Sequence, residues 1–369
     1  MTTDVKKQHT VPRFLLYKFS FETGGKRSRL FTFDKLNEKC FEQTVFDATT
    51  MNSFYNFVDH PDSISLEPVL GVYEDQAAPL IKKIVEEKSI HWLSEKDKYK
   101  IAEFIAVQQS RTNTRLQLIE RIASALDTRL TQMNPSGEKV ETGFGMEGSN
   151  DRKNIFLDGI VSQAEVISIL LKKSWILFET TKENPFFISD NPVTLYNSIN
   201  MGVCSNLGIA LEGIEIYIPL SSTITLGLIC PSIAKLKTQQ AAEISSQPKI
   251  VDVFNKLDAS QKKLVLDSAG QTETEFLQAV KNLNSCIEMA ESFEDGSSYL
   301  IQDKKLKHLN SLQVAQSERY VFSTSKLSVV FQARNPPLVV RCCETRGGFS
   351  LEFFWISIIL RFFAVFWRR

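Results

Sequence analysis

Residues 94–133 constrain the fold more than any other stretch, because they contain neither proline nor glycine. Ser94 followed three residues later by Asp97 is typical of a helix start. The spacing therefore predicts one long helix over 94–133. At about 100° per residue, one face of this helix collects apolar side chains. They are Ile101, Phe104, Ile105, Ile119, Ile122 and Leu126.

Polar side chains interrupt the middle of this apolar face. They are Gln108, Arg111, Thr112 and Arg115. A polar group that is buried without a partner costs roughly a few kcal/mol. We therefore expect polar groups from other segments to lie opposite this part of the helix.

The overall composition is that of a soluble globular protein. Of 369 residues, 43% are hydrophobic and 23% are charged, and the 43 basic residues balance the 43 acidic ones. A net charge of zero excludes a global field that would attract nucleic acid, although local basic clusters are compatible with it. The length allows one large domain or two smaller ones.

The cysteines and the first residues of the chain point to a reducing compartment. The cysteines show neither a C-x-x-C pair nor a metal-ligand spacing. They are Cys40, Cys204, Cys230, Cys286, Cys342 and Cys343. The first residues, MTTDVKKQHTVPRF, are polar and do not read as a secretory signal. We therefore expect a cytoplasmic protein with reduced thiols.

The pattern along the chain predicts an α+β fold, mainly helical, with a small central and mostly antiparallel sheet. Beyond 94–133, helices are expected after Pro12 and at residues 67–88, 162–173, 273–293 and 304–313. Strands are expected at residues 30–33, 175–179, 186–189, 214–218, 223–229 and 320–323. Residues 41–60 read as loop and turn, and residues 134–155 as a loop or linker. We expect residues 1–325 to form a single domain.

The tail, residues 326–369, differs in composition from the rest. Residues 349–367, FSLEFFWISIILRFFAVFW, are nearly long enough to span a bilayer. Arg361 lies inside this run, and a central arginine costs about 2.5–3.5 kcal/mol on insertion scales. Three interpretations stay open: a membrane anchor, a segment folded onto the body, or run-on coding sequence. The abrupt change in composition favours run-on sequence.

Several polar residues stand out as a candidate site, although no metal motif, phosphate-binding loop or nucleophile elbow occurs. We expect catalytic roles for His9, Glu74, Arg111 and Asp190. Ligand binding is expected from Arg13, Gln108, Arg115 and Asn191. His9 and Arg13 are four residues apart and would face one direction if a helix began near Val11.

Taken singly, each of these residues has a structural explanation. His9 could satisfy the core, the arginines could pair with Glu74 or Asp190, and Asp190-Asn191-Pro192 could be a turn. Taken together, they are many polar side chains for one hydrophobic core. If they lie close together in the fold, a functional site is favoured over a structural role.

The chain also resembles a known family, domain-of-unknown-function family 4238. The resemblance rests on Gln8–Leu16 with Phe19, Asn52–Tyr55, Leu66–Glu74 with Ala77–Pro79, Phe104–Gln108 with Arg111, Phe187–Val193, Ile218–Ser221, Leu309-Asn310 and Arg319–Ser323. It covers roughly residues 7–323. The resemblance implies a soluble bacterial protein with a polar set at the positions named above, and no assigned biochemical function. The family pattern normally ends near Ser323, which also sets the tail apart.

The residue types suggest phosphoester hydrolysis, nuclease-like, or nucleotide handling, with nucleic acid or a nucleotide as partner. In this hypothesis Arg13, Arg111 and Arg115 hold phosphate oxygens, and His9 is a general acid or base. Glu74 and Asp190 either orient His9 or bind a divalent metal ion. The alternative is a binding or regulatory module in which the same residues form a structural ion-pair network without turnover. A membrane partner depends on the tail alone.

Overall fold

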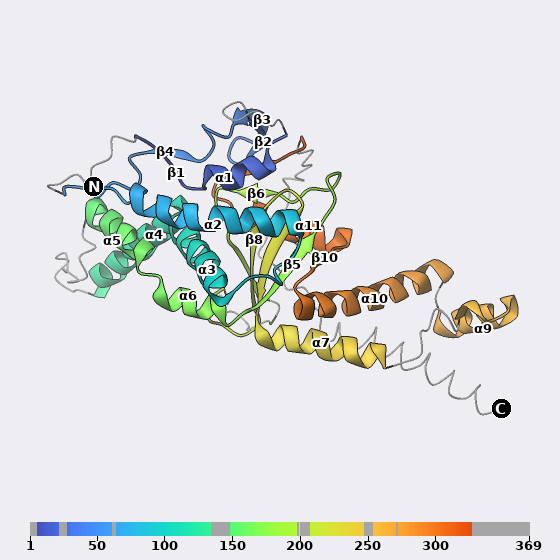
Figure 1. Cartoon of the computed structure of the whole chain (residues 1–369). Helices are drawn as coiled ribbons and strands as arrows, with labels where there is room; N and C mark the ends of the chain where they lie inside the picture. Colours follow the sequence, from blue (N-terminus) through green and yellow to red (C-terminus); the bar gives the residue numbers. More distant parts are fainter. Residues whose placement is uncertain are drawn as a thin grey trace. The chain divides into compact units, whose positions relative to one another are not determined.

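The computed structural model describes residues 6–21, 28–60, 64–133, 148–197, 199, 207–246, 254–270 and 272–326 (Figure 1). Residues 134–147 of the expected linker and residues 327–369 of the tail lie outside this described part. The described residues group into two compact units. The first unit draws on Met1–Pro231 and Asp295–Val330, and the second on Ser232–Glu294. That the two units form the one domain expected over residues 1–325 stays a prediction.

The first unit contains most of the helices and all of the assigned strands. Its helices are α1 (Arg13–Leu16) with the short 3-10 helix η1 (Tyr17–Phe19), α2 (Glu67–Glu87), α3 (Glu95–Ser110), α4 (Asn113–Met133), α5 (Ser149–Val161), α6 (Ala164–Leu171) and α11 (Asp303–Gln316). Its strands are β1 (Lys7–His9), β2 (Arg29–Asp34), β3 (Lys39–Thr44), β4 (Thr50–Asn52), β5 (Ser174–Glu179), β6 (Ile188–Ser189), β7 (Thr194–Asn197), β8 (Ile214–Pro219), β9 (Ile224–Ile229), β10 (Ser298–Leu300) and β11 (Tyr320–Ser323). The expected α+β fold, with helix predominating, is confirmed.

The strands form three small sheets. A five-stranded sheet has the order β10-β5-β9-β8-β7, and a four-stranded sheet has the order β3-β2-β11-β6. β1 and β4 make a two-stranded ribbon. All pairings are antiparallel except β10 with β5. The expected β8–β9 hairpin is present, whereas β3 and β4 lie in the region that the sequence pattern had assigned to loop. β3 alternates poorly because it is an exposed edge strand.

Apolar side chains of three helices cover the five-stranded sheet. Ile81 of α2, Ile105 of α3 and Leu170 of α6 pack with buried residues of β5, β8 and β9 in one core. A second core lies around Tyr55, where the start of α2, the end of α3 and α5 meet. β1 and the first residues of α2 lie beside this second core, and they carry the polar side chains discussed below.

The single helix expected over 94–133 is wrong, because the chain breaks between α3 and α4 at Arg111-Thr112. The Arg111 carbonyl accepts a hydrogen bond from the Tyr55 hydroxyl at 3.0 Å. The amide of Arg115 donates to the Thr112 carbonyl at 3.0 Å, three residues back rather than four. The predicted start is confirmed, since Ser94 and Asp97 form a capping box.

The break also changes which side chains are buried. Ile101, Phe104 and Ile105 of α3 are buried as expected. On α4, Ile122 and Leu126 are 50% and 43% exposed, because the apolar face of α3 does not continue into α4. Residues 149–155 were also expected to be loop, but they form the first turns of α5, where Asp151 bonds the amide of Gly148.

The second unit is helical. It contains most of α7 (Pro231–Ser245) and α10 (Glu273–Asp295), together with α9 (Ala259–Ala269). Phe254, Phe276 and Val280 form its buried cluster. Asp258 caps the start of α9, and Gly270 ends it with a left-handed backbone conformation, φ 62°.

Candidate functional site

Arg111 is the largest fully buried side chain among the described residues, and three of its nitrogens are hydrogen bonded. Nη1 donates to Oε1 of Glu74 at 2.6 Å, and Nη2 donates to the carbonyl of His9 at 2.6 Å. Nε donates to the Tyr55 hydroxyl at 3.1 Å. The guanidinium thus joins the α3–α4 break to α2, to β1 and to the loop before α2.

Burial and charge set the protonation states in this network. Burial raises the pKa of Tyr55 to about 12, so its hydroxyl keeps the proton that it donates to the Arg111 carbonyl. Burial would lower the pKa of Arg111, but the neighbouring Tyr55 and Glu74 raise it above its usual value. Arg111 is therefore a permanent buried cation whose partner charge is Glu74.

Two glutamines fix the backbone that carries His9. Gln108 Nε2 donates to the Thr10 carbonyl at 2.9 Å. Gln8 accepts from the amide of Tyr55 at 2.6 Å and donates to Asn56 at 2.9 Å. Both glutamine side chains are fully buried. They therefore position β1, and neither lines the pocket described below, although Oε1 of Gln108 is buried without a hydrogen-bond partner among the described residues.

His9 lies in β1, and not in a helix beginning near Val11. Its Nε2 is 3.0 Å from the Phe46 carbonyl. Because a carbonyl oxygen only accepts, the ring proton is on Nε2, and Nδ1 keeps its lone pair. Burial lowers the pKa of His9. A neutral imidazole with a free Nδ1 can act as a base near pH 7.

A pocket of about 320 Å³ lies between β1, α1 and α2. Its wall contains charged or titratable side chains from all three segments, with two aromatic rings and one alanine. They are His9, Arg13, Glu67, Glu74, Asp75, Phe14, Tyr17 and Ala78. The four α2 residues recur at spacings of seven, one and three, so one side of that helix faces the pocket.

Glu67 differs from the other carboxylates of the pocket. Its Oε2 is buried and has no hydrogen-bond partner among the described residues. Burial raises the pKa of Glu67, while Arg111 opposes the rise. A carboxyl group in this condition holds its proton to a higher pH than usual and can act as a general acid.

Arg13 and Asp75 are exposed on the rim of the pocket. The Arg13 guanidinium lies 5.6 Å from the centre of the Phe46 ring. Within the described part of the chain, neither Arg13 nor Asp75 forms an ion pair. Both charges are therefore available to a ligand.

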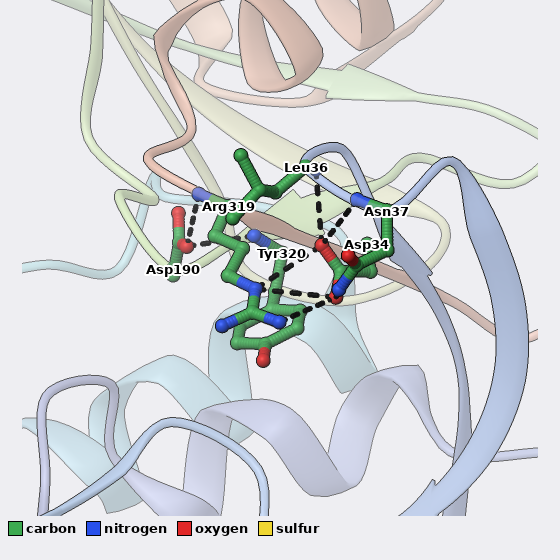
Figure 2. A network of polar contacts seen from close by, with 6 residues as sticks. All are labelled: Asp34, Leu36, Asn37, Asp190, Arg319 and Tyr320. Carbon is green, nitrogen blue, oxygen red and sulfur yellow. Dashed lines mark hydrogen bonds and ion pairs between the residues drawn. The ribbon is translucent and has the colours of Figure 1, made fainter.

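Asp190 belongs to a different network (Figure 2). Its Oδ1 accepts from the amide of Glu318 at 2.8 Å. Its Oδ2 accepts from the amides of Arg319 and Tyr320, each at 2.7 Å. Burial raises the pKa of Asp190, and the three amides counter part of that rise. Asp190 thus holds the start of β11, and among the described residues it has no hydrogen bond or ion pair with His9, Glu74 or Arg111.

Asp34 and Arg319 complete this second network. Arg319 donates from Nε and Nη2 to the Asp34 carboxylate at 3.1 and 2.7 Å. Hydrogen bonds from Arg319 hold the pKa of Asp34 well below its usual range, helped by Asn37 and Leu36. This ion pair joins β2 to the residue just before β11, and β2 and β11 are neighbouring strands of the four-stranded sheet.

Asp190→Asn is expected to lower the free energy of unfolding. In either orientation of the asparagine side chain, its NH₂ group replaces a carboxylate oxygen that accepts from at least one backbone N–H group, so two donors face each other. A buried donor left without an acceptor costs about 1–3 kcal/mol. Urea denaturation of the variant and the wild type measures the difference, and Asp190→Ala should lose more. Equal midpoints for Asp190→Asn and wild type would contradict the capping role.

The remaining two predicted residues lie outside the pocket lining. Asn191 accepts from the Thr112 hydroxyl at 3.3 Å and donates to the Gln316 carbonyl at 3.0 Å. It therefore links the α3–α4 break to the end of α11. Arg115 is exposed on α4. Arg115 does not lie on the same face as Gln108 and Arg111, as had been expected, because the break between α3 and α4 interrupts the helical periodicity.

A family model described as "Protein of unknown function (DUF4238)" matches residues 7–327. The chain belongs to this family. The resemblance in the sequence is thereby confirmed, and it brings no biochemical function with it. No curated protein and no solved structure matches the chain.

The helices and the acidic, histidine and cysteine side chains of this DUF4238 chain bear on membrane insertion and metal binding. Among the described helices, none alone is long and apolar enough to cross a membrane, and one pair bent by 43°, Asn150–Val161 with Ala164–Leu171, passes on length and composition. In the same residues, no group of three or more His, Cys, Asp or Glu side chains is placed to hold a metal ion.

The sequence pattern missed Glu67, Asp75 and Tyr55 in this DUF4238 chain. Glu67 occupies the first turn of α2. An acidic residue there is common because it interacts favourably with the helix dipole, so the sequence pattern did not mark Glu67 as unusual. Its spacing of seven from Glu74 was the available signal, because residues two turns apart share a face. Tyr55 read as an aromatic anchor, and only the fold brings its hydroxyl to Arg111.

Proposed function

We propose that the pocket between β1, α1 and α2 binds a phosphoester and hydrolyses it by general acid–base chemistry. The observation that carries the proposal is the meeting of three groups in one pocket. Among the described residues, these are the imidazole of His9, the buried carboxyl group of Glu67, whose Oε2 has no hydrogen-bond partner, and the guanidinium of Arg13, which forms no ion pair.

In this proposal Arg13 holds the phosphate. A guanidinium presents planar, paired donors that suit phosphate oxygens. Arg111, which the sequence had offered for the same task, is already bonded to Glu74, His9 and Tyr55. Its proposed role is to position the His9 backbone and to neutralise Glu74.

His9 and Glu67 move the two protons. Nδ1 of His9 takes a proton from the attacking water as the new P–O bond forms. Protonated Glu67 gives its proton to the leaving oxygen as the old P–O bond breaks. The lowered pKa of His9 and the raised pKa of Glu67 favour these protonation states in the free pocket. No step is assigned to a metal ion.

A second candidate is a binding module without turnover. The Arg111–Glu74 ion pair and the Asp190 cap favour it, because both join separate segments of the chain without needing a ligand. In that case Arg13 would still bind an anion, but Glu67 and His9 would not affect a rate.

Arg13→Ala tests the proposal. The side chain is exposed, so stability should change by no more than about 0.5 kcal/mol. Loss of one charge-assisted contact should reduce kcat/KM for phosphoester hydrolysis about 10- to 100-fold. The assay uses p-nitrophenyl phosphate and its bis-ester with the full chain.

Arg115→Ala is the matched control, since it removes another exposed arginine outside the pocket. It should keep wild-type kcat/KM. Equal losses in both variants, or no hydrolysis by the wild type of either ester, would defeat the hydrolase proposal. Phosphate binding by the wild type without hydrolysis would support the binding module.

A further inference from the structure

The pocket contains groups that phosphate binding and proton transfer leave unused. Asp75 carries a second, negative charge at the rim, and the rings of Phe14 and Tyr17 line the wall. Arg13 and Asp75 line the same pocket, yet no ion pair joins them within the described residues. Among the described residues of the pocket, Arg13 and Asp75 thus present charges of opposite sign that do not pair with each other.

We propose that the phosphoester bound here carries an ammonium group, which contacts Asp75 and the rings of Phe14 and Tyr17. This inference rests on the proposed function and names the substrate class: an aminoalkyl phosphate. The phosphate end lies on Arg13, and the cationic end lies on the acid and the two rings.

The charge of the pocket favours a ligand with both signs. Arg111 neutralises Glu74 at 2.6 Å. Burial keeps His9 neutral and moves Glu67 toward its neutral form. Arg13 and Asp75 are the exposed charged side chains of the pocket lining, one of each sign. A ligand with only a phosphate would place a negative charge near the negative Asp75. A zwitterion presents its phosphate to Arg13 and its cation to Asp75.

The aromatic wall favours an ammonium over a hydroxyl. A cation over the face of an aromatic ring is attracted by the ring quadrupole, and ammonium ligands are recognised in this way. Phe14 is held in place by its contact with Phe104, with ring centres 5.5 Å apart. The half-buried rings of Phe14 and Tyr17 are thus partly available to a ligand.

The test compares phosphocholine with 3,3-dimethylbutyl phosphate, which has the same shape but a neutral carbon in place of the ammonium nitrogen. Isothermal titration calorimetry with the full chain gives a Kd for each. The wild type should bind phosphocholine about tenfold more tightly. Asp75→Asn should reduce this ratio to about threefold or less. Asp158→Asn, which changes an exposed acid of α5 outside the pocket, should keep the wild-type ratio.

Each other outcome counts against the inference. Equal affinity of the wild type for both probes overturns the ammonium site and leaves phosphate binding standing. Tighter binding of adenosine monophosphate than of phosphocholine overturns it in favour of a nucleotide. A wild-type ratio that survives in Asp75→Asn removes Asp75 from the site. If no probe binds to the wild type, the proposed function fails together with the inference.

Discussion

Arg111→Met is expected to lower the free energy of unfolding by about 3–5 kcal/mol, as is typical when one partner of a buried ion pair is removed. Arg111 is 1% exposed and bonds to Glu74, Tyr55 and the His9 carbonyl. Methionine fills similar space but supplies no donors, so it leaves the Glu74 charge and two oxygens without their partner. Urea or guanidinium denaturation at neutral pH gives the measurement.

Two comparisons make the result specific to the network. Arg115→Met, at an exposed position on α4, should change stability by no more than about 0.5 kcal/mol. Adding Glu74→Gln to Arg111→Met should cost less than the sum of the two single changes, because the neutral amide no longer needs the cation. A strictly additive double variant would show that Glu74 and Arg111 do not act as a pair.

Glu67→Gln is expected to abolish most of the proposed hydrolysis and at the same time to stabilise the protein at neutral pH. Removing a general acid lowers kcat by about 10²–10⁴-fold.

The gain in stability follows from the linkage between proton binding and folding. Because burial raises the pKa of Glu67, the folded chain binds this proton more tightly than the unfolded chain, and stability falls as pH rises through the folded pKa. Glutamine carries no such charge. The stability of the variant relative to the wild type should therefore increase as the pH rises above about 4, where glutamate ionises in the unfolded chain.

Glu103→Gln is the matched control for this change. Burial also raises the pKa of Glu103, which lies on α3 and does not line the pocket. Its glutamine variant should show a pH-dependent gain in melting temperature in the same direction, with unchanged kcat. Full activity in Glu67→Gln would remove Glu67 from the mechanism, and loss of activity in both variants would point to a general effect of charge.

Elements set by local patterns were predictable from the sequence. β11 (Tyr320–Ser323) and the β8–β9 hairpin follow from alternation and a turn, and the start of α3 follows from Ser94 and Asp97. The break between α3 and α4 was not predictable in this way. It depends on the Tyr55 hydroxyl reaching the Arg111 carbonyl from 56 residues away, and no local pattern carries that contact.

The candidate site was predictable in part. The sequence selected His9, Glu74 and Arg111, and their contacts bring them together because polar groups in an apolar surface need partners. The same rule placed Asp190 with them, but its partners are the amides of residues 318–320. Polarity indicates that a partner exists and does not identify it.

The pairing of β2 with β11 has a consequence for how the chain is made. Asp34 and Arg319 are 285 positions apart, and the strands that they join are neighbours in the four-stranded sheet. At roughly 5–20 residues per second, a ribosome takes roughly 15–60 s to travel between them. Throughout that interval β11 has not been synthesised, so one edge of β2 has no partner strand. The backbone amides that bind Asp190 are also still missing. The four-stranded sheet is therefore completed late in translation. Chaperones that recognise unpaired strands should bind the nascent chain near β2.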